Sequence, residues 1–398
     1  MNSRARVAAA MRHEMPDRVP VMCQLALGHY FLHSDRRPAE IWFDSRIFVE
    51  TLAEFCGRYG HDGFLLNLPG RPANWRDYLA STEQTAAGER LVWRGGLVTL
   101  VPRDDNPHTF TAYGGPLPRA DYTSVDVNDP AIYRLPGYVW NTFHAPSLWD
   151  IPPEADLTDP GAYPEWFGGA VRYARDLCPE ASVHVEVFSP FTHLLEFFSY
   201  EQALIALVEA PQTCHAMLER FTRIVETQLT LYAACQPDAI LISSAFAGAG
   251  FVSRRMYEEF VLPYEARLAA RAHAEQQLVY THTCGAIGDR LDLMLATGID
   301  GLDTLDPPPL GTVDLTVAKS RYGERCFFKG NLDAVNEMLR ADDVTFDQAV
   351  RERLRIGGPK SGYILSSACS VAPGVSPARL QRMVRLAEMH GRYPLPGQ

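Results

Sequence analysis

The chain has 398 residues, of which 46% are hydrophobic and 21% are charged, a composition typical of a soluble globular protein with a sizeable core. Its formal net charge of −11 and its pI of about 5.6 argue against a nucleic-acid partner, because such a partner requires a basic surface. We find no apolar stretch of the ~20 residues that span a bilayer and no signal-peptide pattern, so we expect a cytoplasmic protein without a membrane partner.

Short runs of β-branched and aromatic residues alternate with amphipathic segments along the chain. Most of these runs lack polar alternation, as do strands that are buried in a parallel sheet. The predicted strands are Arg18–Gln24, Asp62–Leu68, Ser182–Phe188, Ala239–Ser244, Gln277–His282, Ile299–Leu305, Arg325–Leu332 and Gly362–Ser367. The predicted helices are Ile47–Tyr59, Gln202–Ala233, Arg254–Glu275, Ala286–Thr297, Thr345–Ile356 and Pro377–His390.

Repeated strand–helix units predict a parallel sheet, and eight predicted strands suggest closure into a (β/α)8 barrel of the TIM type. An open, doubly wound sheet is the alternative. The pattern breaks at about residues 69–180, where LVWRGGLVTLVP predicts a β-hairpin that turns at Gly95-Gly96. We therefore expect a single α/β domain over residues 1–398, with an insertion that either covers the barrel mouth or is only a surface excursion.

Two short segments carry residues suited to metal binding. In Thr281-His282-Thr283-Cys284-Gly285, residues two apart in an extended chain point to the same side, so His282 and Cys284 can face one point. Cys369 follows the last predicted strand, and all strands of a parallel barrel end on one rim. Three such ligands with a fourth open position describe a catalytic zinc site. The alternative is a polar histidine and two small buried cysteines, as we expect for the other six cysteines.

Other polar residues near predicted strand ends are candidates for the barrel mouth. Glu186 is the candidate catalytic residue, because a lone carboxylate there could complete the metal coordination or act as a general base. A paired carboxylate at a strand end is the alternative for Glu186, and backbone capping is the alternative for most of the other candidates. The candidate substrate-binding residues are Gln24, His29, Asn67, Ser243, Asp303 and Asn331.

The chain resembles the uroporphyrinogen decarboxylase superfamily, in particular its zinc-containing branch of corrinoid- and thiol-linked methyltransferases. The resemblance covers nearly the whole chain. Its motifs are PDRVPV (16–21), FVSRRMYEEFVLPY (251–264), THTCG (281–285), GIDGLD (298–303), KGNLD (329–333) and GYILSSACSVAPGVSP (362–377). The H-x-C…C zinc pattern of this branch falls on His282, Cys284 and Cys369.

Two positions differ from the decarboxylase branch. That branch has arginines after its first strand that hold the porphyrinogen carboxylates, whereas this chain has no arginine between Arg18 and Arg36. It also has a histidine where this chain has Cys369. The methyltransferase branch often has an acidic pair after its mid-chain strand, which here is Ser243-Ser244, so the resemblance does not identify the fourth zinc ligand.

The resemblance implies a zinc-dependent methyl- or alkyltransferase, in which Zn²⁺ activates a thiol for attack on an electrophilic carbon. In this branch that carbon is usually a methyl group on a corrinoid, which is either free or carried by a separate protein. The implied partners are a small-molecule thiol or methyl donor, and the superfamily often forms homodimers. Two alternatives stay open: a metal-free decarboxylase or lyase on the same barrel, and a non-catalytic corrinoid- or ligand-binding protein.

Overall fold

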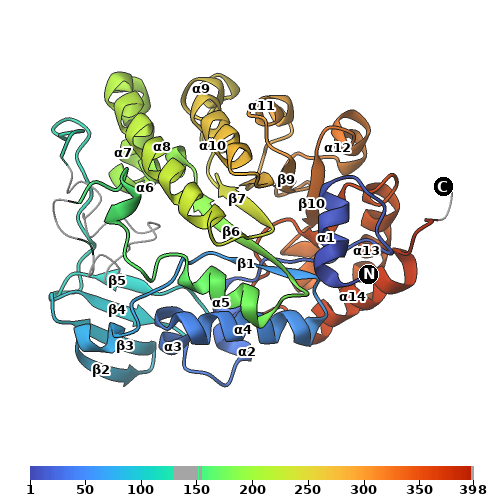
Figure 1. Cartoon of the computed structure of the whole chain (residues 1–398), viewed down its shortest axis with the longest axis horizontal. Coiled ribbons are helices and arrows are strands. Elements are labelled where there is room, and N and C mark those ends of the chain that lie inside the picture. The colour runs from blue at the N-terminus through green and yellow to red at the C-terminus, as the bar shows by residue number, and fades with distance from the viewer. Residues whose placement is uncertain (130–150, 152–154, 396–398) are drawn as a thin grey trace.

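The computed structural model describes residues 1–129, 151 and 155–395. These residues form an α/β fold around a curled parallel sheet of seven strands (Figure 1), which confirms the predicted class and the parallel arrangement. The strands, in sheet order, are β1 (Gly63–Leu66), β6 (Ser182–Phe188), β7 (Ala239–Ser243), β8 (Val279–Thr283), β9 (Gly301–Thr304), β10 (Phe327–Leu332) and β11 (Tyr363–Ser367).

The segment Arg18–Gln24 differs from its prediction as a regular strand. It makes isolated bridges, one of which pairs Val21 in parallel with Leu365 of β11. The prediction was wrong because Pro20 has no N–H to donate and because the N–H of Val21 binds the Asp62 carboxylate at 2.8 Å. The carbonyl of Val21 accepts the N–H of Asp62, directly before β1. The segment therefore contacts both outer strands of the sheet.

Most helices lie on the outer face of the curled sheet (Figure 1). Two predicted helices are each divided, Gln202–Ala233 near Pro211 and Arg254–Glu275 near Pro263, because proline begins a helix readily but cannot continue one. None of the described helices has the length and apolar character needed to cross a membrane. The helices are α1 (Ser3–Met11), α2 (Leu27–His33), α3 (Pro38–Phe43), α4 (Ser45–Tyr59), α5 (Gly169–Leu177), α6 (Pro190–Phe198), α7 (Tyr200–Glu209), α8 (Pro211–Ala233), α9 (Arg254–Phe260), α10 (Leu262–Ala274), α11 (Leu291–Ala296), α12 (Leu315–Tyr322), α13 (Asp343–Gly357) and α14 (Pro377–His390).

Alternate strand residues are buried in two separate cores, because successive side chains of a strand point to opposite faces. The larger core lies between the sheet and the helices and includes Ile240 and Leu302. The smaller core includes Leu241, Tyr280 and Phe327, and it packs against α1. These residues lie in the early part of their strands. The space enclosed by the curl is therefore apolar near the strand starts, and the later inward positions are available for polar residues.

The stretch after β1 contains a separate antiparallel sheet (Figure 1). Its strands, in sheet order, are β2 (Leu79–Thr85), β3 (Gly88–Trp93), β4 (Val98–Val101) and β5 (His108–Phe110). The predicted hairpin is confirmed, since Val92 pairs with Val98 and Gly96 has a φ of +85°, which glycine adopts readily. Residues 130–150 and 152–154 of the predicted insertion lie outside the described residues.

Candidate metal centre

Four polar residues lie in one row across neighbouring strands. Ser243 of β7 is paired with His282 of β8, and His282 is paired with Asp303 of β9. Asp303 is paired in turn with Lys329 of β10. All four residues are buried, and residues paired across adjacent strands share one face of the sheet. We call Ser243, His282, Asp303 and Lys329 the polar row; it lies one layer beyond the apolar core that packs on α1.

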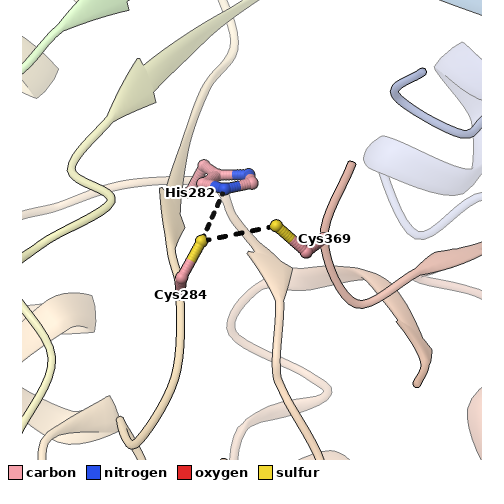
Figure 2. A group of neighbouring side chains, drawn as sticks. All are labelled: His282, Cys284 and Cys369. Carbon is pink, nitrogen blue, oxygen red and sulfur yellow. Dashed lines mark hydrogen bonds between the residues drawn. The ribbon is translucent and has the colours of Figure 1, made fainter. Parts of the chain in front are cut away.

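His282, Cys284 and Cys369 converge at the C-terminal ends of β8 and β11 (Figure 2). One ligand atom of each residue lies within 4.8 Å of the other two. His282 Nε2 is 3.2 Å from Cys284 Sγ, which is 3.6 Å from Cys369 Sγ. In the described ranges, no other group of three His, Cys, Asp or Glu side chains converges in this way. The three residues predicted as metal ligands are therefore brought together by the fold.

The spacing of these donors fits a tetrahedral zinc ion. With Zn–S bonds of about 2.3 Å and Zn–N bonds of about 2.0 Å, tetrahedral angles place two sulfurs about 3.8 Å apart and a nitrogen and a sulfur about 3.5 Å apart. The separations of 3.6 Å and 3.2 Å in this cluster differ from those values by only a few tenths of an ångström. Thiolate and imidazole are also donor types that zinc prefers. The residues present therefore fit zinc with little rearrangement.

Protons are shared within this cluster. Burial lowers the pKa of His282, but the interactions with Asp303 and Cys369 outweigh that effect and raise the pKa to about 10. The hydrogen bond from Cys284 and the adjacent imidazole lower the pKa of Cys369 to about 4, against the effect of burial. The bond to Cys369, together with burial, raises the pKa of Cys284 well above its usual range. These directions favour a thiolate at Cys369 beside a protonated His282, and a bound divalent metal would replace protons in the cluster.

Asp303 and Lys329 lie behind the His282 ring. Asp303 Oδ2 is 2.9 Å from His282 Nδ1, and Asp303 Oδ1 accepts a hydrogen bond from Lys329 Nζ at 2.8 Å. Nδ1–H can donate to this carboxylate while Nε2 faces the sulfurs, an arrangement common among metal-binding histidines. Asp303 was predicted as a substrate-binding residue, and Lys329 was missed. The signal for Lys329 was a single lysine within the otherwise uncharged strand run CFFKGNL.

Glu186 lies on β6 and is 8% exposed; the register pairs it with Leu241 of β7, two residues before Ser243. Burial raises its pKa to about 6, while His282 and Ser243 act in the opposite direction. A carboxyl group with this pKa can accept and release a proton near neutral pH. Glu186 and Ser243, both predicted as mouth residues, therefore lie in the same electrostatic environment as the metal-ligand candidates.

The remaining candidates are not part of the group of three converging side chains. Gln24 and Asn67 line one small pocket together. His29 is completely buried, with Nε2 2.8 Å from the Tyr59 hydroxyl and Nδ1 3.4 Å from the Ala372 carbonyl oxygen. His29 therefore connects α4 with the loop that follows Cys369.

Both polar atoms of the Asn331 side chain form hydrogen bonds within the protein. Its Nδ2 donates to the Leu305 carbonyl at 2.8 Å, and its Oδ1 accepts from Arg353 Nε at 3.1 Å. This matches the backbone-bonding alternative for Asn331 more closely than contact with a substrate.

Sequence reasoning also missed Asp306, which follows β9. Its Oδ2 accepts the N–H of Gly285 at 2.6 Å, so it fixes the turn that follows Cys284. Burial raises the pKa of Asp306 to about 6. The only signal in the sequence was a second acidic residue three positions after Asp303. Asp306 thus holds the segment that contains Cys284 through its backbone.

The fold and this cluster define a parallel β/α protein with its chemically active groups at the C-terminal ends of the strands. The chain belongs to the uroporphyrinogen decarboxylase (URO-D) family, whose sequence pattern matches residues 150–390. This confirms the superfamily predicted from the motifs.

Similarity to individual proteins agrees with this assignment. The uroporphyrinogen decarboxylase of Tolumonas auensis is 26% identical over 179 residues, which cover 44% of this chain and 47% of that protein. The one from Saccharopolyspora erythraea is 30% identical over 193 residues, covering 47% and 52% of the two chains. The chain thus spans about half the length of these curated relatives. A methyltransferase from Methanosarcina mazei shares the fold, with a TM-score of 0.70 and 14% identity, over 98% of this chain and 99% of that one.

Proposed function

We propose that this protein is a zinc-dependent methyl- or alkyltransferase whose metal is held by His282, Cys284 and Cys369. The convergence of these three donors within 4.8 Å is the observation that carries the proposal. When bound there, zinc would keep a substrate thiol deprotonated at neutral pH, whereas a free thiol with a pKa of about 8.5 is mostly protonated. The fold shared with the Methanosarcina mazei methyltransferase supports the same class of reaction.

The residues around the cluster have separate roles in this proposal. Cys284 and Cys369 supply sulfur ligands and His282 supplies Nε2, which leaves a fourth position for the substrate sulfur. Glu186, with a pKa raised to about 6 by burial, accepts the proton that the thiol releases. Ser243 lies beside His282 in the polar row, where it borders the position of the substrate.

The electrophile that we propose is a methyl group on a corrinoid. A methyl-corrinoid would supply the methyl carbon to the substrate sulfur: an S–C bond would form as the C–Co bond breaks, with the electron pair of that bond left on cobalt. The corrinoid would be free or carried by a separate protein.

We also propose a cytoplasmic homodimer. In each chain Arg18–Gln24 closes the sheet as an eighth barrel unit, and the insertion covers the barrel mouth. The bond from Ala120 N–H to the Phe197 carbonyl at the end of α6 supports that position of the insertion.

A metal-free decarboxylase is the second candidate, because the curated relatives are uroporphyrinogen decarboxylases. A substrate with several carboxylates requires cations that are available to pair with it. The first two arginines after Arg18 are already paired, Arg36 with Glu54 and Arg37 with Glu89. This pairing favours the transferase. A non-catalytic corrinoid- or ligand-binding protein is the third candidate, because serines replace the acidic pair at Ser243-Ser244.

The test is methyl transfer from methylcobalamin to a panel of small thiols, followed through the change in the corrinoid spectrum. We expect transfer by the zinc-loaded protein and its loss in Cys284→Ser and Cys369→Ser. Cys178→Ser is the matched control, because Cys178 is a half-buried thiol outside the cluster. Full transfer by both ligand variants, or decarboxylation of uroporphyrinogen by the metal-free protein, would contradict the proposal.

A further inference from the structure

The polar row contains a buried lysine. Lys329 lies two strands away from His282, and Asp303 lies between them. Lys329 is 3% exposed and Asp303 is 2% exposed, and their side chains form an ion pair at 2.8 Å. A buried charge is costly unless it is paired and hydrogen-bonded. Even for two paired charges, the loss of hydration can exceed their mutual attraction, so we look for the use of this pair in its position.

Asp303 is held at both of its carboxylate oxygens. Oδ1 accepts from Lys329 Nζ, and Oδ2 faces His282 Nδ1 at 2.9 Å. A carboxylate with one free oxygen can rotate, whereas a carboxylate bound at both oxygens has one orientation. Asp303 thus fixes the His282 ring, and Lys329 in turn fixes Asp303 at its other oxygen.

The sheet register makes this arrangement possible. His282, Asp303 and Lys329 are successive partners on β8, β9 and β10. Paired residues on neighbouring parallel strands have side chains within contact distance on one face. The relative positions of the Lys329 ammonium group, the Asp303 carboxylate and the His282 imidazole are therefore set by the sheet and not by a loop.

We propose that Lys329 is a positioning residue for the metal centre. It holds Asp303 so that Nδ1–H of His282 stays on Oδ2 and Nε2 stays aimed at the two sulfurs. This inference rests on the proposed zinc centre, and it adds a residue that is hydrogen-bonded to Asp303 rather than to one of the three proposed ligands. Partners behind a metal-binding histidine typically change metal affinity by about 10–100-fold when they are removed.

A purely structural ion pair is the competing explanation, and the chain offers a matched control. Asp62 lies directly before β1, is fully buried, and pairs with Arg18 at 2.8 Å. It is at the opposite end of the strands from the cluster. Arg18→Met therefore removes one buried cation partner of Asp62, which keeps Arg6 at 2.6 Å, without touching the polar row.

The experiment measures Co²⁺ affinity by chelator competition, together with the visible spectrum of the cobalt protein and its melting temperature. We expect Lys329→Met and Asp303→Asn to weaken Co²⁺ binding by about 10–100-fold and to shift the ligand-field bands. Sulfur-to-cobalt charge transfer should persist, because both cysteines remain. Lys329→Arg should recover part of the affinity, since it restores a cation for Asp303. Arg18→Met should lower the melting temperature and leave the affinity and spectrum unchanged.

A double variant tests the route through Asp303. If Lys329 acts only through that carboxylate, Lys329→Met combined with Asp303→Asn should bind Co²⁺ no more weakly than Asp303→Asn alone. Unchanged affinity and spectrum in Lys329→Met, with wild type binding Co²⁺ through sulfur, would overturn this inference alone. Wild type that binds no Co²⁺ would overturn the proposed function itself, and the two failures are therefore distinguishable.

Discussion

Gly248 lies directly against Cys284: a Cβ atom at position 248 would be 2.7 Å from the Cys284 carbonyl oxygen. Gly248 belongs to the loop after β7. In that loop the Ala245 carbonyl accepts the N–H of Cys284 at 3.3 Å. The loop after β7 therefore sets the backbone position of Cys284 through contacts at both its N–H and its carbonyl.

Gly248→Ala should push this loop away from Cys284 and disturb the sulfur position. We expect a loss of roughly 1–3 kcal/mol in the free energy of unfolding and weaker zinc binding in chelator competition. Gly250→Ala is the control, because nothing lies within 4 Å of a Cβ atom there. Equal zinc affinity for the two variants would contradict this prediction.

Glu186→Gln should separate general-base chemistry from metal binding. Because we assign proton acceptance to Glu186, the variant should retain zinc while its rate of methyl transfer falls by about 10²-fold or more. The pH profile should also lose the ionisation near pH 6 that burial confers on this carboxyl. A variant that loses its zinc would instead identify Glu186 as the fourth ligand and contradict the assigned role.

His29 should support Cys369 at a distance. Replacing His29 by Leu removes its contact with the Ala372 carbonyl, so the loop after Cys369 should move and zinc should bind more weakly. Tyr59→Phe removes the partner on the other side of the ring and leaves the loop contact in place. We expect that variant to lose about 1 kcal/mol of stability at unchanged zinc affinity. Chelator competition on both variants is the measurement, and equal affinities would refute this role of His29.

Glu265 should make the stability fall as the pH rises. It is buried on α10 near the Tyr257 hydroxyl, and burial raises its pKa from 4.5 to about 7. Between these two values the folded chain retains a proton that the unfolded chain releases, so the stability present at low pH is lost as the pH rises through about 7. In Glu265→Gln this contribution disappears. The free energy of unfolding, measured at pH 5 and pH 8, should therefore fall less in the variant than in wild type; equal decreases would contradict the assignment.

The convergence of His282, Cys284 and Cys369 could be predicted from the sequence for physical reasons. His282 and Cys284 are two residues apart at a strand end, and the period of two in extended chains places such residues on one side. Cys369 could be added because parallel strands end on one rim. None of these steps requires knowledge of the sheet register.

The residues that were missed do require the register. Lys329 acts through Asp303, and their contact follows from the pairing of β9 with β10, which the sequence does not specify. The failure of Arg18–Gln24 as a regular strand has a similar cause, because the Asp62 side chain takes the N–H of Val21. A competing bond from a distant side chain leaves no local signal in the strand itself.

The most direct test of the central claim is the zinc content of the purified protein, measured by elemental analysis beside Cys284→Ser and Cys369→Ser. We expect about one zinc per chain, since a site of this kind binds a single ion, and we expect its loss in both variants. Cys178→Ser should keep its zinc. Wild type without zinc, or a wild-type zinc content retained in Cys284→Ser and Cys369→Ser, would contradict the proposed metal centre.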